Sequence, residues 1–172
     1  LWECTNALAA EPRWQSVEGN LPDLPVNWVM AHPQNPSLAW VATDLGIWYT
    51  ESLDGGSTSW QPCSAFPFVR TDMIRLRRSD YTMVAATHGR GIWTARLDSN
   101  GTVADPVWQE RGPTNVGGRT RTLLIDPNDP TGQTVWAGSV SGGLWRTRGI
   151  SSVGLASPEA ADPAFAASPN PF

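Results

Sequence analysis

The chain has 172 residues, a formal net charge of −4 at pH 7 and only 16% charged residues. All of its basic residues are Arg, and the acidic balance leaves no broad basic face of the kind that nucleic acids require. No apolar run approaches the ~20 residues that a membrane-spanning helix needs. Glycine (16), proline (15) and tryptophan (10) are abundant, which favours many short strands joined by tight turns.

Tryptophan recurs with a nearly constant period, and when the repeated segments are aligned, the tryptophans fall into two columns. The first column holds Trp2, Trp48, Trp93 and Trp145, which are 46, 45 and 52 residues apart. The second column holds Trp14, Trp60 and Trp108, which are 46 and 48 residues apart. Together the columns contain seven of the ten tryptophans. Such a period is typical of proteins built from repeated supersecondary units.

The columns divide the chain into units that are each predicted to contain four short strands. Residues 1–20 hold the last two strands of a partial unit, residues 21–64 and 65–112 hold four each, and residues 113–149 hold three. Within a unit, the third strand contains the first-column Trp and the fourth begins at the second-column Trp. Residues 150–172 are rich in Ala, Ser and Pro without periodicity, and they are predicted to be a linker.

Four antiparallel strands in roughly 40–45 residues is the period of a β-propeller blade. Neighbouring sheets stack about 10 Å apart, and Trp side chains fill the gap between them. The sequence therefore predicts an all-β fold of about three propeller blades. Because closed propellers typically need about four to eight blades, we expect the remaining blades to come from the same polypeptide or from another chain, for example in a homo-oligomer.

One hairpin segment carries a family resemblance. The stretch SLDGGSTSW (52–60) resembles the Asp-box of sialidase-type and sortilin-type propellers through Ser52, Asp54, Gly56 and Thr58, with Ser59 inserted before the Trp. In these families the box lies between the third and fourth strands, away from the ligand face. The resemblance implies a structural role, in which the Asp carboxylate and the hydroxyls accept hydrogen bonds from backbone N–H groups of the turn.

Two further stretches point to a location outside the cell. RGPTNVGGRTRTLLIDPNDP (111–130) and VWAGSVSGGLWRT (135–147) resemble secreted bacterial members of the same group. The terminal SPNPF (168–172) resembles the start of the sorting domain carried by cargo of the type IX secretion system. The resemblance implies a secreted or cell-surface protein.

A ligand face is expected where the second-to-third strand turns and the interblade loops emerge. The polar side chains that these segments bring to one mouth are Asp44, His88, Arg90, Arg119 and Arg121. The interblade loops also carry Arg70 and Asp72. A solvated rim without a ligand is the alternative interpretation.

Asp44 carries the sharpest catalytic hypothesis. AHPQNPSLAWVATDLGIWY (31–49) is similar to the first blade of xyloglucan-cleaving glycosidases, where the corresponding Asp is one of two catalytic carboxylates. An inverting pair is about 6.5–9.5 Å apart, and the other units offer His88 and Val140 at the matching position instead of a second Asp. The preferred function is a non-catalytic recognition or scaffold module for a glycan or protein partner. The alternatives are a glycoside hydrolase that uses Asp44 and a structural subunit of an extracellular assembly.

The remaining chemistry-bearing residues suggest no metal site and no cofactor. Cys4 and Cys63 have no metal-binding spacing, and they are either a disulfide pair or two separate small residues. His32 ends an inner strand before Pro33, at the position of Asp126 in the last unit, and is expected to cap the following turn.

Overall fold

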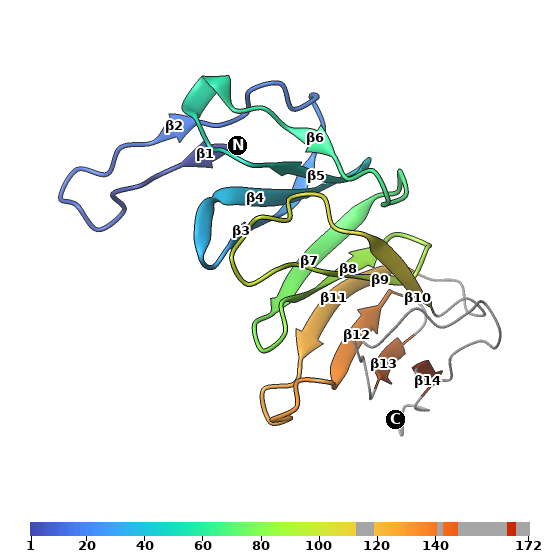
Figure 1. Ribbon diagram of the computed structural model, residues 1–172. Coiled ribbons are helices and arrows are strands. Elements are labelled where there is room, and N and C mark those ends of the chain that lie inside the picture. The colour runs from blue at the N-terminus through green and yellow to red at the C-terminus, as the bar shows by residue number, and fades with distance from the viewer. Residues whose placement is uncertain (113–118, 141–142, 148–164, 168–172) are drawn as a thin grey trace.

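The structure is a computed structural model that describes residues 1–112, 119–140, 143–147 and 165–167 (Figure 1). These residues form an all-β fold without an α-helix, in one two-stranded and three four-stranded antiparallel sheets. The predicted fold class of four-stranded antiparallel sheets is therefore confirmed, although the described sheets do not close into a ring. No helix among the described residues is long and apolar enough to cross a membrane.

Each sheet is a meander in which strands that follow one another in the chain lie side by side. The first sheet comprises β1 (Trp2–Glu3) and β2 (Gln15–Ser16). The second comprises β3 (Val26–His32), β4 (Asn35–Thr43), β5 (Gly46–Thr50) and β6 (Gln61–Pro62), with the short 3₁₀ helix η1 (Gly55–Ser57) between β5 and β6. The third comprises β7 (Thr71–Arg77), β8 (Thr82–Thr87), β9 (Ile92–Arg96) and β10 (Trp108–Gly112). The fourth comprises β11 (Thr120–Ile125), β12 (Val135–Ser139), β13 (Gly143–Thr147) and β14 (Phe165–Ala167).

The fourth sheet differs from the prediction in one respect. Residues 165–167 lie inside the predicted linker, but they form β14 and pair with β13, which adds a fourth strand where three were expected. The free edge of β13 offers unpaired backbone groups, so a short apolar run can complete the sheet. The rest of the predicted linker and the terminal SPNPF motif lie outside the described residues.

The tryptophan columns occupy one register in successive sheets. Each first-column Trp on a third strand pairs with the residue two positions after the second-column Trp on the fourth. These pairs are Trp2 with Ser16, Trp48 with Pro62, and Trp93 with Glu110. The same backbone pattern is thus repeated in the first three sheets, as the period of the sequence predicts.

Most column tryptophans pack against the preceding sheet. Trp60, Trp108 and Trp145 are buried in three successive apolar cores, one between each pair of neighbouring sheets. Trp48 and Trp93 are partly buried against the same cores. These side chains fill the gaps between stacked sheets, as predicted.

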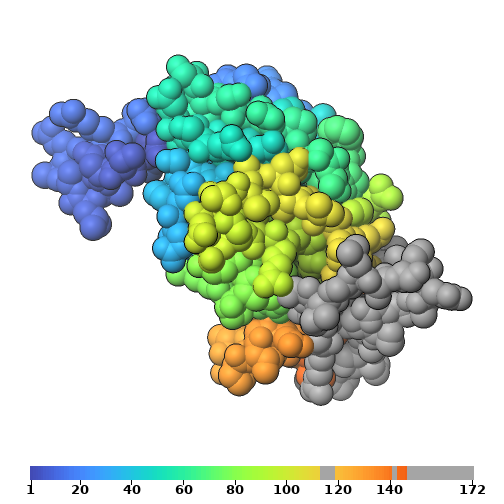
Figure 2. All heavy atoms as spheres, viewed as in Figure 1, coloured from blue at the N-terminus to red at the C-terminus, as the bar shows by residue number. Residues whose placement is uncertain are grey.

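The first sheet is the exception, because no sheet precedes it in the structure. Trp2 is 65% exposed and Trp14 is 63% exposed. Figure 2 shows this hairpin projecting away from the body of the molecule. The burial of a column Trp therefore depends on a neighbouring sheet and not on its own strand.

The two cysteines do not form a disulfide. Cys4 directly follows β1 and is partly exposed, Cys63 directly follows β6 and is buried, and both are free thiols. Burial is the main cause that raises the pKa of the Cys63 thiol far above its usual range. This thiol is therefore a small apolar core group with little nucleophilic character.

Candidate functional site

The inner strands β3, β7 and β11 each contain a β-bulge at the same position. The strand register shifts between Val26 and Trp28, between Thr71 and Met73, and between Thr120 and Thr122. The extra residues are therefore Asn27, Asp72 and Arg121. A bulge re-aims the side chain of the extra residue and is common next to functional sites. Three polar side chains consequently lie at equivalent positions, near the beginning of β3, β7 and β11.

Two neighbouring sheets are joined at this level by the mouth cluster, which comprises Asn27, Asp44, Arg70 and Asp72. The Asn27 amide donates to Asp44 Oδ1 and to the Thr71 carbonyl, both at 3.0 Å. The Arg70 guanidinium contacts Asp44 Oδ1 at 3.4 Å and Asp72 Oδ1 at 2.9 Å. Its hydrogen bond to Asp72 is the largest cause that raises the Arg70 pKa.

The Arg70 guanidinium contacts one oxygen of each carboxylate in the mouth cluster. The Asp72 side chain is only 8% exposed, and its Oδ2 is buried without a hydrogen-bond partner. The cluster therefore links two neighbouring sheets through hydrogen bonds and ion pairs among its own side chains.

The other candidate residues of the predicted mouth lie at the next junction between sheets. The backbone of His88 forms an isolated bridge with Arg119, and its N–H donates to the Arg70 carbonyl at 2.8 Å. The structure thus brings Asp44 together with Arg70, and His88 together with Arg119. Arg90 and Arg121 are exposed, in the β8–β9 turn and on the β11 bulge respectively.

Arg70 and Asp72 were both expected in an interblade loop, but Asp72 lies on β7, and only Arg70 lies in the connection before it. The available signal was a polar residue second in each inner strand, in Val-Asn-Trp, Thr-Asp-Met and Thr-Arg-Thr. The side chains at this position point the same way because each strand has a bulge there, and the sequence pattern does not show a bulge. The mouth cluster was therefore not predicted.

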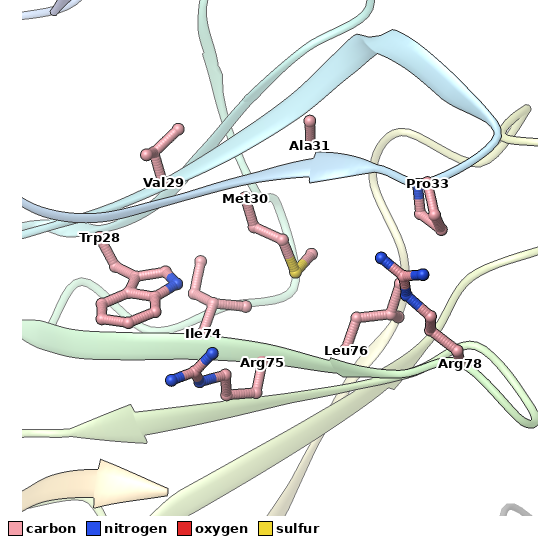
Figure 3. Close-up of a pocket in the computed structure, with 9 residues that line it drawn as sticks. All are labelled: Trp28, Val29, Met30, Ala31, Pro33, Ile74, Arg75, Leu76 and Arg78. Carbon is pink, nitrogen blue, oxygen red and sulfur yellow. The ribbon is translucent and has the colours of Figure 1, made fainter. Parts of the chain in front are cut away.

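A groove of about 340 Å³ runs between β3 and β7 (Figure 3). Trp28 and Met30 point from β3 toward β7, and the Arg75 guanidinium carbon lies 4.7 Å from the centre of the Trp28 ring. Arg78 lies at the far end, below Pro33. The residues that line the groove are Trp28, Val29, Met30, Ala31, Pro33, Ile74, Arg75, Leu76 and Arg78. The lining contains two guanidinium groups and no carboxylate.

The Asp-box segment forms a tight turn on the second sheet, and Thr58 organises it. Its hydroxyl accepts from the Asp54 N–H at 2.9 Å and donates to the Gly55 carbonyl at 2.8 Å. The Asp54 side chain is exposed and makes no capping hydrogen bond to η1, in contrast to the role expected for it. Ser52 and Gly56 are also exposed.

The equivalent connection of the third sheet shows the carboxylate-centred turn that was expected of the box. Asp98 accepts hydrogen bonds from Asn100, Thr102 and Val103. Desolvation opposes ionisation, but these hydrogen bonds outweigh it and lower the Asp98 pKa to about 2.

No group of three or more His, Cys, Asp and Glu side chains suited to a metal ion occurs among the described residues. No protein-family model matches the chain, and no curated protein is detectably similar to it. The resemblance to Asp-box propellers therefore stays a prediction from the residues themselves.

Proposed function

We propose that the chain is part of an Asp-box β-propeller of a secreted or cell-surface protein, and that it is a non-catalytic recognition or scaffold module. It binds a glycan or protein partner on the face formed by the mouth cluster and the groove. The remaining blades come from the same polypeptide or from another chain.

One observation carries the non-catalytic assignment. Asp44 is the best catalytic candidate in the sequence, and its Oδ1 is held by both Asn27 and Arg70. The nearby Asp72 is held by the same guanidinium. These contacts fix the orientation of both carboxylates, and a preformed polar surface of this kind suits ligand recognition.

A hydrolysis screen tests this proposal directly. The full chain, Asp44→Ala and the exposed control Asp23→Ala are incubated with xyloglucan and other β-glucans, and reducing ends are counted. We expect no turnover by any of the three proteins. Binding of the same proteins to immobilised glycans and to surface-protein fractions is measured in parallel. Turnover by the wild type and Asp23→Ala, but not by Asp44→Ala, would establish the hydrolase instead.

The glycoside hydrolase remains the second candidate, because the structure adds a carboxylate that the sequence pattern lacked. Asp72 shares Arg70 with Asp44, so two carboxylates stand at one junction between sheets. The third candidate, a structural subunit of an extracellular assembly, is favoured by the exposed apolar side chains Trp2, Trp14 and Leu144. Mass measurement of the intact particle separates it from the other two.

A further inference from the structure

We infer that the groove between β3 and β7 binds an extended acidic peptide, which pairs with the free edge of β3 and places carboxylates on Arg75 and Arg78. This inference rests on the proposed recognition function and specifies its partner. It concerns a different set of side chains from the mouth cluster.

The charge of the groove supports an anionic partner. Arg75 and Arg78 are exposed, and neither forms an ion pair within the part of the chain that the structure describes. No carboxylate lines the groove, although the whole chain is acidic. The groove is therefore locally positive, although the net charge of the chain is negative.

Arg75 is held in place by its stacking on Trp28. The guanidinium carbon lies 4.7 Å from the ring centre, a distance at which the cation and the aromatic face attract each other. A stacked guanidinium keeps its N–H donors at its rim, where a carboxylate can accept two of them. Because the indole already orients this group, less side-chain freedom is lost when an anion binds.

The backbone at the groove supports a peptide that lies in an extended conformation. β3 and β7 are the terminal strands of their sheets, and each pairs with one strand only in the described structure. Val29 and Ala31 of β3 line the groove, and in Figure 3 their side chains point away from β7. A terminal strand presents unpaired N–H and C=O groups that an incoming strand can satisfy.

The lining of the groove favours a peptide over a glycan. Apart from the two arginines and the indole N–H of Trp28, the lining side chains are apolar, with no hydroxyl, amide or carboxylate among them. Sugar hydroxyls need acceptors as well as donors, and they lose hydrogen bonds with water on burial. A strand of alternating acidic and apolar residues instead offers carboxylates to Arg75 and apolar side chains to Met30 and Leu76.

The test uses the full chain and short labelled peptides, with fluorescence anisotropy as the measurement. The probe alternates Glu and Val, and matched peptides replace Glu by Lys or by Gln. We expect the Glu peptide to bind and the Lys and Gln peptides to bind much more weakly. Arg75→Gln and Arg78→Gln should each weaken binding by about fivefold, which is the upper range for an exposed ion pair. The exposed control Arg13→Gln should leave binding unchanged.

Backbone pairing and partner class have separate readouts. A Glu–Val peptide with alternate N-methylated amides keeps its charge but loses strand pairing, so we expect it to lose binding. Circular dichroism confirms that each variant is folded. Equal affinity for the methylated peptide, or no response to the Arg75 and Arg78 variants, would overturn the inference. Preferential binding of oligogalacturonides or neutral oligosaccharides would overturn it in favour of a glycan. If no acidic peptide binds but other surface ligands still do, the acidic-peptide inference is rejected and the recognition function stands. If the chain cleaves glycans and this activity depends on Asp44, the recognition function itself is rejected.

Discussion

At the scale of single residues, two equivalent tryptophans have opposite environments. Trp60 is 1% exposed, and its indole N–H donates to the Val17 carbonyl of the first unit at 2.9 Å. Trp14 directly precedes β2, as Trp60 directly precedes β6, but Trp14 is 63% exposed. The two positions have the same residue type and the same place relative to the following strand. A difference between the stabilities of variants at these positions therefore measures the contribution of the neighbouring sheet.

We predict that Trp60→Ala destabilises the fold by about 3–5 kcal/mol, since it leaves a large cavity in a core between two sheets. Trp14→Ala should change the free energy of unfolding by less than about 0.5 kcal/mol, as is usual for exposed positions. Urea denaturation followed by circular dichroism measures both values. Similar losses at the two positions would contradict the stacking that the structure shows.

Two aspartates in equivalent connections also differ. Asp98 accepts several hydrogen bonds inside its turn, whereas Asp54 is exposed and caps nothing. The Asp98 pKa is lowered to about 2, below the ~3.9 of a free Asp. A group with a depressed pKa in the folded state stabilises the fold above its unfolded pKa, and this contribution is lost as the pH falls through the folded value.

We therefore predict that Asp98→Asn destabilises the protein at pH 7, and that the difference from the wild type shrinks between about pH 4 and pH 2. The amide retains only one acceptor atom and brings its own N–H groups toward the donors of the turn. Asp54→Asn should match the wild type throughout. Denaturation curves at several pH values test the prediction, and an Asp98→Asn difference that does not vary with pH would contradict it.

At the scale of elements, the sheets are fastened to each other by their connections. The β9–β10 connection packs on the β3–β4 turn, where the Asp98 carbonyl lies 3.0 Å from His32 Nε2. His32 Nδ1 also accepts from the Gln34 N–H at 3.2 Å, which confirms the predicted turn-capping role. Gly101 also lies close to this turn, because a Cβ there would lie 2.7 Å from the Asn35 Cβ and 2.9 Å from His32 Nδ1.

We predict that Gly101→Ala is more destabilising than Gly89→Ala. Both glycines have positive φ, +70° and +96°, so each substitution should cost about 1–2 kcal/mol in backbone strain. Only position 101 adds a steric conflict between sheets, which costs a further ~1–3 kcal/mol. Thermal unfolding of the two variants measures the difference, and equal losses would show that the connection can move away from β3–β4.

The elements were predicted from the sequence far better than the site was. The tryptophan columns, the turn before Trp93 and the apolar second strands predicted four-stranded sheets, since these signals depend on neighbours within one unit. The mouth cluster depends on contacts between units, such as Asn27 with Asp44 and Arg70 with Asp72. β14 was missed because its three residues carry no periodicity of their own and pair only because β13 has a free edge.

At the scale of the whole molecule, the stack of sheets presents an open apolar face at each end. Leu144 is 56% exposed, whereas the equivalent residues Ile47 and Ile92 are 2% and 0% exposed because a following sheet covers them. At the opposite end of the stack, Trp2 and Trp14 are exposed. At both ends, the exposed side chains are large and apolar, like the equivalent residues that are buried in the neighbouring sheets.

These two faces should make the chain associate with itself or with further blades, because each offers the other the type of surface that covers it inside the stack. We predict that the mass measured by light scattering rises with protein concentration, and that Leu144→Arg shifts this rise to at least about tenfold higher concentration, as the loss of one buried apolar contact would. Leu8→Arg is the matched control, since Leu8 is fully exposed in the loop that joins β1 and β2. A monomer at all concentrations, or an equal effect of the two substitutions, would mean that the end faces remain in water and that the exposed tryptophans contribute nothing to assembly.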